Sequence, residues 1–102
     1  MTIDLYSIYD KSDKVTAQKV EDEFMIISIE PNKNRLVEKL YSLNETGQKL
    51  WNHLNGELNL YQLIKTLSKE YNKDFHLQIQ EDVMALMKIL LTHKIVKEVN
   101  PK

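Results

Sequence analysis

The segment from Leu43 to Gly56 constrains this chain most, because it marks where extended structure gives way to helices. Asn44 is a favourable N-cap residue, since its side-chain oxygen can accept a hydrogen bond from an amide of the first helical turn. Glu45 then places a negative charge at the positive end of the helix dipole. Glycine at position 56 supplies a left-handed residue past the end of that short helix. The sequence therefore predicts strands before Asn44 and helices after it.

The composition excludes several function classes. A chain of 102 residues, 42% of them apolar, is expected to form one domain with a modest core. Its net charge of −1 does not favour a strongly basic nucleic-acid binder. The absence of cysteine excludes disulfides, thiolate metal sites and thiol nucleophiles. We find no signal peptide and no apolar run of membrane-spanning length, so a cytoplasmic protein without membrane contact is expected.

Three strands are expected in the N-terminal half. Val15 to Val20 alternates weakly, whereas Phe24 to Ile29 is apolar on both sides and is predicted to be a central strand covered on both faces. Residues 30–34 have the composition of a hairpin loop. Arg35 to Leu43 is predicted as the third strand, and its interspersed charges are typical of a sheet edge. Residues 1–13 are predicted to be either a short strand or an arm.

Three helices and an extended tail are expected in the C-terminal half. The first helix, from about Glu45 to Leu54, presents Trp51 as a core residue. The second begins with a predicted capping box, Asn59 and Gln62, and continues with apolar residues at helical spacing. The third covers about residues 77–93, and residues 95–99 form a strand-like tail. The predicted class is α+β: a winged helix-turn-helix-like fold with a three-stranded antiparallel sheet first and a short C-terminal wing strand last.

The sequence resembles the PqqD family, whose members recognise ribosomally synthesised, post-translationally modified peptides. The resemblance is carried first by Leu43-Asn44-Glu45-Thr46-Gly47 and Trp51, then by Leu54-Asn55-Gly56. Further matching positions are Leu63-Ile64, Tyr71, Asp82-Val83 and Leu90-Leu91. It covers residues 14–99, so we expect an N-terminal arm at 1–13 and a peptide-recognition domain at 14–100.

The resemblance implies a non-catalytic protein without a cofactor. Family members bind the leader segment of a precursor peptide as an added antiparallel strand and present the precursor to a maturation enzyme, such as a radical SAM protein or a leader peptidase. Here the leader is expected to lie along the third strand, against the third helix. The expected peptide-binding residues are Arg35, Leu36, Val37, Glu38, Lys39, Leu40, Tyr41 and Ser42 of the strand, with Ile79, Gln80, Val83, Met84 and Met87 of the helix.

Simpler interpretations of the same residues stay open. The third helix carries more apolar residues than one core contact requires, and the extra methionines fit either a peptide groove or plain packing. Arg35 and Lys39 suit either the steering of an acidic leader or a solvated edge that discourages aggregation. The three histidines are too far apart in sequence to form a close pair of metal ligands, so no metal site is expected.

Two other functions compete with peptide recognition. A winged-helix protein can bind DNA, but the third helix opens with Glu81 and Asp82, which repel phosphates. A homodimeric interaction protein is also possible, because an exposed edge strand can pair with its own copy. An enzyme is not expected, since the sequence contains no phosphate-binding glycine loop and no nucleophile motif.

Overall fold

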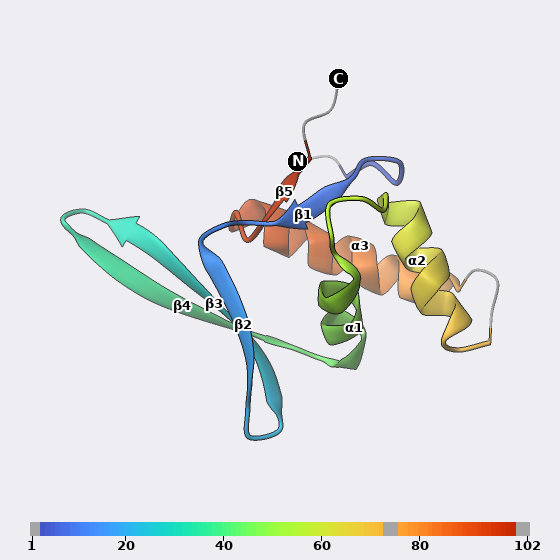
Figure 1. Cartoon of the computed structure of the whole chain (residues 1–102), viewed down its shortest axis with the longest axis horizontal. Coiled ribbons are helices and arrows are strands. Elements are labelled where there is room, and N and C mark those ends of the chain that lie inside the picture. The colour runs from blue at the N-terminus through green and yellow to red at the C-terminus, as the bar shows by residue number, and fades with distance from the viewer. Residues whose placement is uncertain (1–2, 73–75, 100–102) are drawn as a thin grey trace.

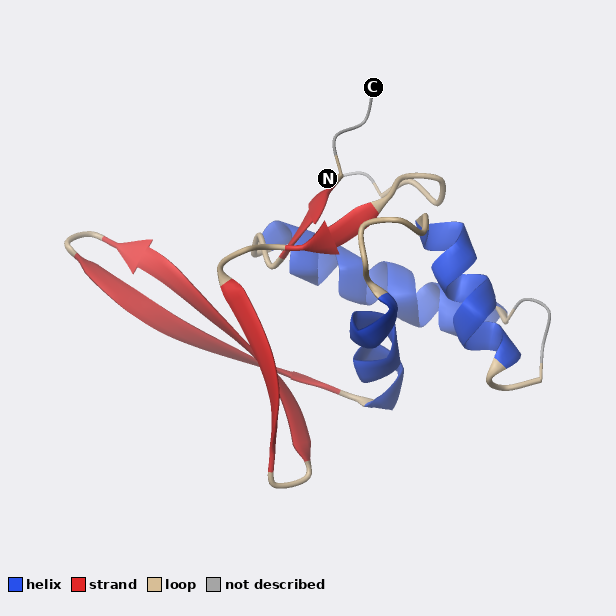
Figure 2. Cartoon of the chain, in the orientation of Figure 1, coloured by secondary structure: helices blue, strands red, loops and turns tan. Residues whose placement is uncertain are grey.

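The computed structural model describes residues 3–72 and 76–99, which contain two antiparallel sheets and three helices (Figures 1 and 2). The strands are β1 (Tyr9–Lys11), β2 (Val15–Val20), β3 (Glu23–Asn32), β4 (Arg35–Leu43) and β5 (Val96–Glu98). The helices are α1 (Glu45–His53), α2 (Leu60–Lys69) and α3 (Leu77–Thr92). The predicted α+β class is confirmed, as is the order of a three-stranded antiparallel sheet, three helices and a closing strand.

Strands β2, β3 and β4 form a meander joined by two tight turns. Val20 pairs with Glu23 and Asn32 pairs with Arg35, so each hairpin loop has two residues. Glu21 and Lys33, the first residues of these loops, both have positive φ, which matches the twist of the adjoining strands. The predicted loop at residues 30–34 is therefore too long: β3 continues to Asn32 because Pro31 occupies a strand position opposite Leu36.

The central position of β3 is confirmed, but the expectation that both of its faces are covered is wrong. On one face Ile26 is fully buried and Ser28 is 3% exposed. On the other face Ile29 is 46% exposed. The physical reason is visible in Figure 1, where the helices lie to one side and the β3–β4 hairpin projects away from them. We call the two sides of this sheet its inner and outer faces.

The N-terminal segment is a strand that belongs to the body of the protein. Strand β1 pairs antiparallel with β5, and Tyr9 is buried in the core at 2% exposure. The carbonyls of Leu5 and Ser7 accept hydrogen bonds from the amides of Tyr61 and Leu60, at 2.8 and 3.1 Å. These are amides of the first turn of α2, which have no partner inside their own helix. Residues 5–11 thus contact both the helices and the closing strand. Residues 1 and 2 of the predicted arm and residue 100 of the predicted domain lie outside the residues that the structure describes.

The helix boundaries follow from capping chemistry. The Asn44 side chain accepts a hydrogen bond from the Gly47 amide at 2.8 Å, so it caps α1 as predicted. The predicted capping box of α2 is also confirmed, because Asn59 and Gln62 exchange side-chain-to-backbone bonds of 2.8 and 2.9 Å. Trp51 is 5% exposed and lies in the core as expected. The caps fix where each helix starts, and hence which residues it turns toward the core.

Pairing with β1 places the closing strand in the smaller sheet. Val96 is buried, and the backbone amide of Ile95 donates a 2.8 Å hydrogen bond to the carbonyl of Leu90, which turns the chain sharply at the end of α3. Because β5 pairs with β1, it lies outside the β2–β3–β4 sheet. The winged helix-turn-helix comparison therefore stays a prediction.

The burial of Tyr9 predicts that the N-terminal strand contributes to stability. Replacing Tyr9 with alanine removes a core ring and is expected to lower the free energy of unfolding by about 3 kcal/mol. Tyr6→Ala is the matched control, because that ring is 71% exposed. Urea denaturation followed by circular dichroism measures both, and equal midpoints for the two variants would show that the N-terminal strand is not part of the core.

Candidate functional site

Strand β4 is an edge strand, and one row of its backbone groups faces away from the sheet. The amide of Ile29 donates to the carbonyl of Lys14 at 3.4 Å, so at this position β3 faces β2. Because successive residues of a strand point to opposite sides, Ser28 and Glu30 then face β4 and bond to Lys39 and Val37. The β4 residues whose N–H and C=O groups point to the open edge are Leu36, Glu38, Leu40 and Ser42. Within the described part of the chain no strand pairs with this edge.

A close contact at Gly47 joins β4 to the helices. A Cβ atom at this position would lie 3.1 Å from Leu86 Cδ2 and 3.3 Å from both Leu43 Cβ and Asn44 Oδ1. Only a residue without a side chain lets the first turn of α1 approach the end of β4 and the middle of α3 at once. The glycine of the Leu43–Gly47 motif thereby fixes the angle between the sheet edge and α3.

Beside this junction lies a hollow of about 240 Å³ between the end of β4 and α3. We call it the inner hollow. Its base is apolar and its rim is polar, with Asp82 accepting a 3.0 Å hydrogen bond from the Gln78 side chain. It is lined by Ser42, Leu43, Asn44, Thr46, Gly47, Leu50, Asp82, Val83, Ala85 and Leu86. Two of the predicted site residues, Ser42 and Val83, are thus brought together here.

A second hollow of about 350 Å³ continues along α3. We call it the outer hollow. It is lined by Gln80, Glu81, Met84, Ala85 and Lys88, and it shares Ala85 with the inner hollow. We use the word groove for the open edge of β4, the inner hollow beside it and the outer hollow on the adjoining side of α3. The groove contains Gln80 and Met84, two further residues of the predicted set.

The predicted helix residues divide between core and groove. Ile79 and Met87 are 5% and 0% exposed, and Val83 is 1% exposed with only its edge reaching the inner hollow. Packing in the core accounts for these three side chains, whereas Met84 is only partly buried. Asp82 and Leu86 line the inner hollow but were not predicted. Their sequence positions could have indicated this role, because residues 82 and 86 lie one turn apart on α3, next to the residues that face the core.

The predicted strand residues divide by face. Val37, Lys39 and Tyr41 point to the inner face, where the Tyr41 ring lies 5.4 Å from the ring of His93 after α3. Leu36 and Leu40 point to the outer face and are 72% and 55% exposed. The contact between Tyr41 and His93 places the C-terminal end of α3 next to the second half of β4, while Asp82 lies near the last residues of that strand. Strand and helix are therefore antiparallel.

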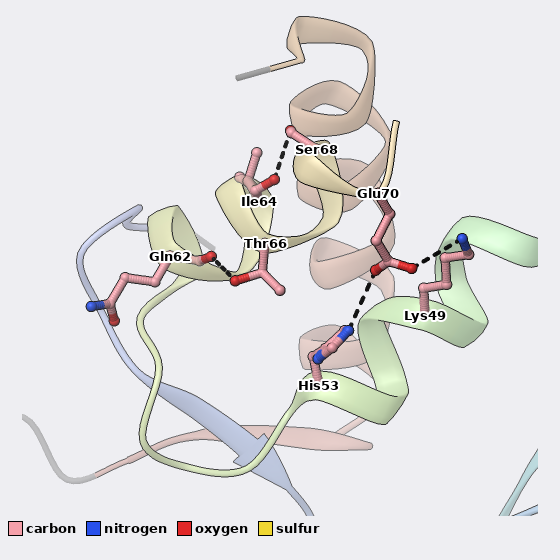
Figure 3. A network of polar contacts seen from close by, with 7 residues as sticks. All are labelled: Lys49, His53, Gln62, Ile64, Thr66, Ser68 and Glu70. Atoms are coloured by element: carbon pink, nitrogen blue, oxygen red, sulfur yellow. Dashed lines mark hydrogen bonds and ion pairs between the residues drawn. The ribbon is translucent and has the colours of Figure 1, made fainter. Parts of the chain in front are cut away.

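Polar contacts from two residues of α1 to one carboxylate join α1 to the end of α2 (Figure 3). The Glu70 carboxylate lies 3.2 Å from Lys49 Nζ and 3.5 Å from His53 Nε2. The hydrogen bond from Lys49 to Glu70 raises the pKa of the Lys49 ammonium above its ordinary value. Because the pKa of Lys49 is higher in the folded state, its protonated form adds to the free energy of unfolding below pH 10.5. This contribution is lost as the pH rises above that value. Nearby, Ser68 donates to the Ile64 carbonyl and accepts from the His76 amide, which ties α2 to the start of α3.

The described residues contain no cluster of three or more His, Cys, Asp or Glu side chains that could hold a metal ion. His76 instead caps α3, with its Nδ1 atom 3.4 Å from the Ile79 amide. No helix in residues 3–72 or 76–99 is long and apolar enough to cross a membrane. The groove therefore offers backbone hydrogen bonds, apolar hollows and charges as its means of binding.

Comparison with known proteins finds one family. Residues 23–96 match the family model described as Coenzyme PQQ synthesis protein D (PqqD). The matched range covers the central hairpin, all three helices and the first residue of β5. Neither the comparison with curated proteins nor that with solved structures gives a significant match.

The contact at Gly47 predicts that a larger residue there destabilises the junction. Gly47→Val forces Leu86 and Leu43 apart and is expected to cost about 1–3 kcal/mol of unfolding free energy. Thr46→Val is the matched control, since it places the same side chain on the same helical turn at a partly exposed position. Thermal denaturation measures both, and an equal loss in the two variants would show that close packing at Gly47 does not set the effect.

Proposed function

Because this chain belongs to the PqqD family, we propose that it binds the leader segment of a ribosomally synthesised precursor peptide and presents it to a modifying enzyme. Family membership is consistent with a role in making PQQ or a related peptide-derived product, and with an accessory protein that is not itself an enzyme. The observation that carries the proposal is the open edge of β4 beside the inner hollow.

In the proposed complex the leader adds to β4 as an antiparallel fourth strand. The outward N–H and C=O groups of Leu36, Glu38, Leu40 and Ser42 bond to its backbone. Each such bond contributes about 0.5–1.5 kcal/mol net, and because it involves the backbone it does not depend on the leader's sequence. The edge therefore holds the leader's backbone whatever its sequence, and selectivity has to come from side chains.

The hollows provide that selectivity. An added strand lies about 4.8 Å from β4, and every second side chain points to the inner face, toward α3. An apolar side chain near its start would enter the inner hollow, whose base contains Leu50 and Leu86. Met84 in the outer hollow suits side chains of differing shape, because its thioether is flexible.

The outer face of the sheet is the surface we propose for the modifying enzyme, such as a radical SAM protein or a leader peptidase. Strand addition at the edge leaves this face uncovered. It carries Ile29, Leu36 and Leu40, and a hollow of about 450 Å³ lies between Ile29, Pro31 and Leu36. Exposed apolar groups of this kind are typical of interaction sites. The chain would thus hold the leader at one edge and contact the enzyme through the outer face.

Leu40→Pro tests strand addition. Proline removes the outward amide at position 40 but none of the β3–β4 bonds, so the variant is expected to fold and to bind at least tenfold more weakly, about 1.4 kcal/mol. Fluorescence anisotropy with the labelled leader of a precursor encoded beside this gene measures the affinity. Lys19→Pro is the matched control, because position 19 faces the open edge of β2 on the other side of the same sheet.

Two outcomes would contradict the proposal. Unchanged affinity in folded Leu40→Pro would exclude the β4 edge as the binding surface. A dimer in gel filtration that persists when leader is added would favour the homodimeric alternative, in which β4 pairs with its own copy. The DNA-binding alternative gains no support from α3, where Glu81 and Asp82 are exposed.

Ile29→Lys tests the enzyme surface. A charge at the centre of the outer face is expected to weaken binding of the modifying enzyme at least fivefold while leader affinity stays unchanged, since Ile29 lies outside the groove. Val20→Lys is the control, with a similar exposure of 45% against 46% but at the far end of the sheet. Pull-down of the enzyme encoded beside the gene measures both, and equal behaviour of the two variants would rule out this part of the outer face.

A further inference from the structure

The groove has an acidic end and a basic end. The β2–β3 turn lies beyond the end of β4, because Phe24 pairs with Leu43. Near this end lie six acids with three lysines, Lys19, Lys49 and Lys88. Lys49 lies one helical turn from Glu45 and forms its ion pair with Glu70. We call the six acids the acidic end; they are Glu21, Asp22, Glu23, Glu45, Glu81 and Asp82.

The opposite end carries the other sign. Lys33 and Arg35 lie at the tip of the β3–β4 hairpin, and Lys94 borders a pocket with Glu30 and Pro31. Lys39 lies 3.7 Å from Glu30, which partly offsets its charge. We call these four cations, Lys33, Arg35, Lys39 and Lys94, the basic end. Their acidic neighbours are Glu30 and Glu38.

These charges are available to a ligand. None of the six acids forms an ion pair with any described residue, and neither does Arg35. Among residues 3–72 and 76–99, the Asp82 carboxylate accepts a hydrogen bond only from the neutral Gln78 amide. Like charges separated by less than a Debye length of about 8–10 Å add their fields, as the sequence neighbours at residues 21–23 and 81–82 do.

From this arrangement we infer that the groove selects a leader of a particular polarity: basic residues in the N-terminal half of the bound segment and acidic residues in its C-terminal half. The inference rests on the proposed function. Strand β4 runs from the basic end to the acidic end, so a guest strand antiparallel to it begins at the acidic end. A guest with the opposite arrangement places like charges together at both ends, which costs affinity and slows association.

Two labelled peptides of identical composition test this inference. The first is Lys-Lys-Thr-Leu-Val-Leu-Thr-Glu-Glu, and the second exchanges the two lysines with the two glutamates. In about 20 mM salt we expect the first to bind roughly tenfold more tightly, because four exposed charge pairs each contribute a fraction of a kcal/mol. In about 500 mM salt the difference should fall to less than about threefold, since screening weakens exposed charges.

Protein variants show where the preference arises. Glu81→Gln with Asp82→Asn neutralises part of the acidic end and is expected to reduce the preference by about threefold. Glu57→Gln with Glu98→Gln is the control: it changes the net charge equally at exposed positions outside the groove and should leave the preference intact.

The outcomes separate this inference from the proposed function. Equal binding of the two peptides at low salt, or a preference for the second, would overturn the polarity while leaving a peptide-binding groove. If fluorescence anisotropy detects no binding of either peptide at protein concentrations up to about 1 mM, both strand addition and the preferred charge arrangement are ruled out. If the control variant reduces the preference as much as the Glu81→Gln, Asp82→Asn variant does, the preference comes from net charge and the inference is overturned.

Discussion

The close approach of backbone at Gly47 is the constraint on which the rest of the structure depends. It brings the end of β4, the first turn of α1 and the middle of α3 within van der Waals distance of one another. It is a tight contact between the end of β4 and the helices, while the far part of the β3–β4 hairpin projects away from them (Figure 2). The groove is a consequence, since its inner hollow is lined by residues on all three sides of this contact.

Local chemistry made part of this arrangement predictable. Asn44, Asn59 and Gln62 act within a few residues of their own position, so their roles as caps could be assigned from the sequence. The extent of β4 was likewise predictable from its apolar and charged residues. The pairing of β1 with β5 was not, because nothing in either three-residue segment specifies a partner more than eighty residues away.

The division of α3 between core and groove lay beyond sequence reasoning for a different reason. Its apolar residues cover more than one side, and periodicity identifies a side without saying what it contacts. The position of Gly47 settles that question, because it brings Leu86 rather than Met87 to the junction. The methionines therefore divide: Met87 is core, and Met84 borders the outer hollow. The packing interpretation is confirmed for Met87, and the groove interpretation stays a prediction for Met84.

Energetics explain why an open edge alone makes a poor recognition site. Four outward-facing residues offer eight backbone groups, which contribute about 8 kcal/mol if every bond forms with an average net value. Ordering a guest segment of similar length costs about 1–2 kcal/mol per residue, so the backbone terms at best cancel. Net affinity then has to come from side chains in the hollows and from charges at the two ends.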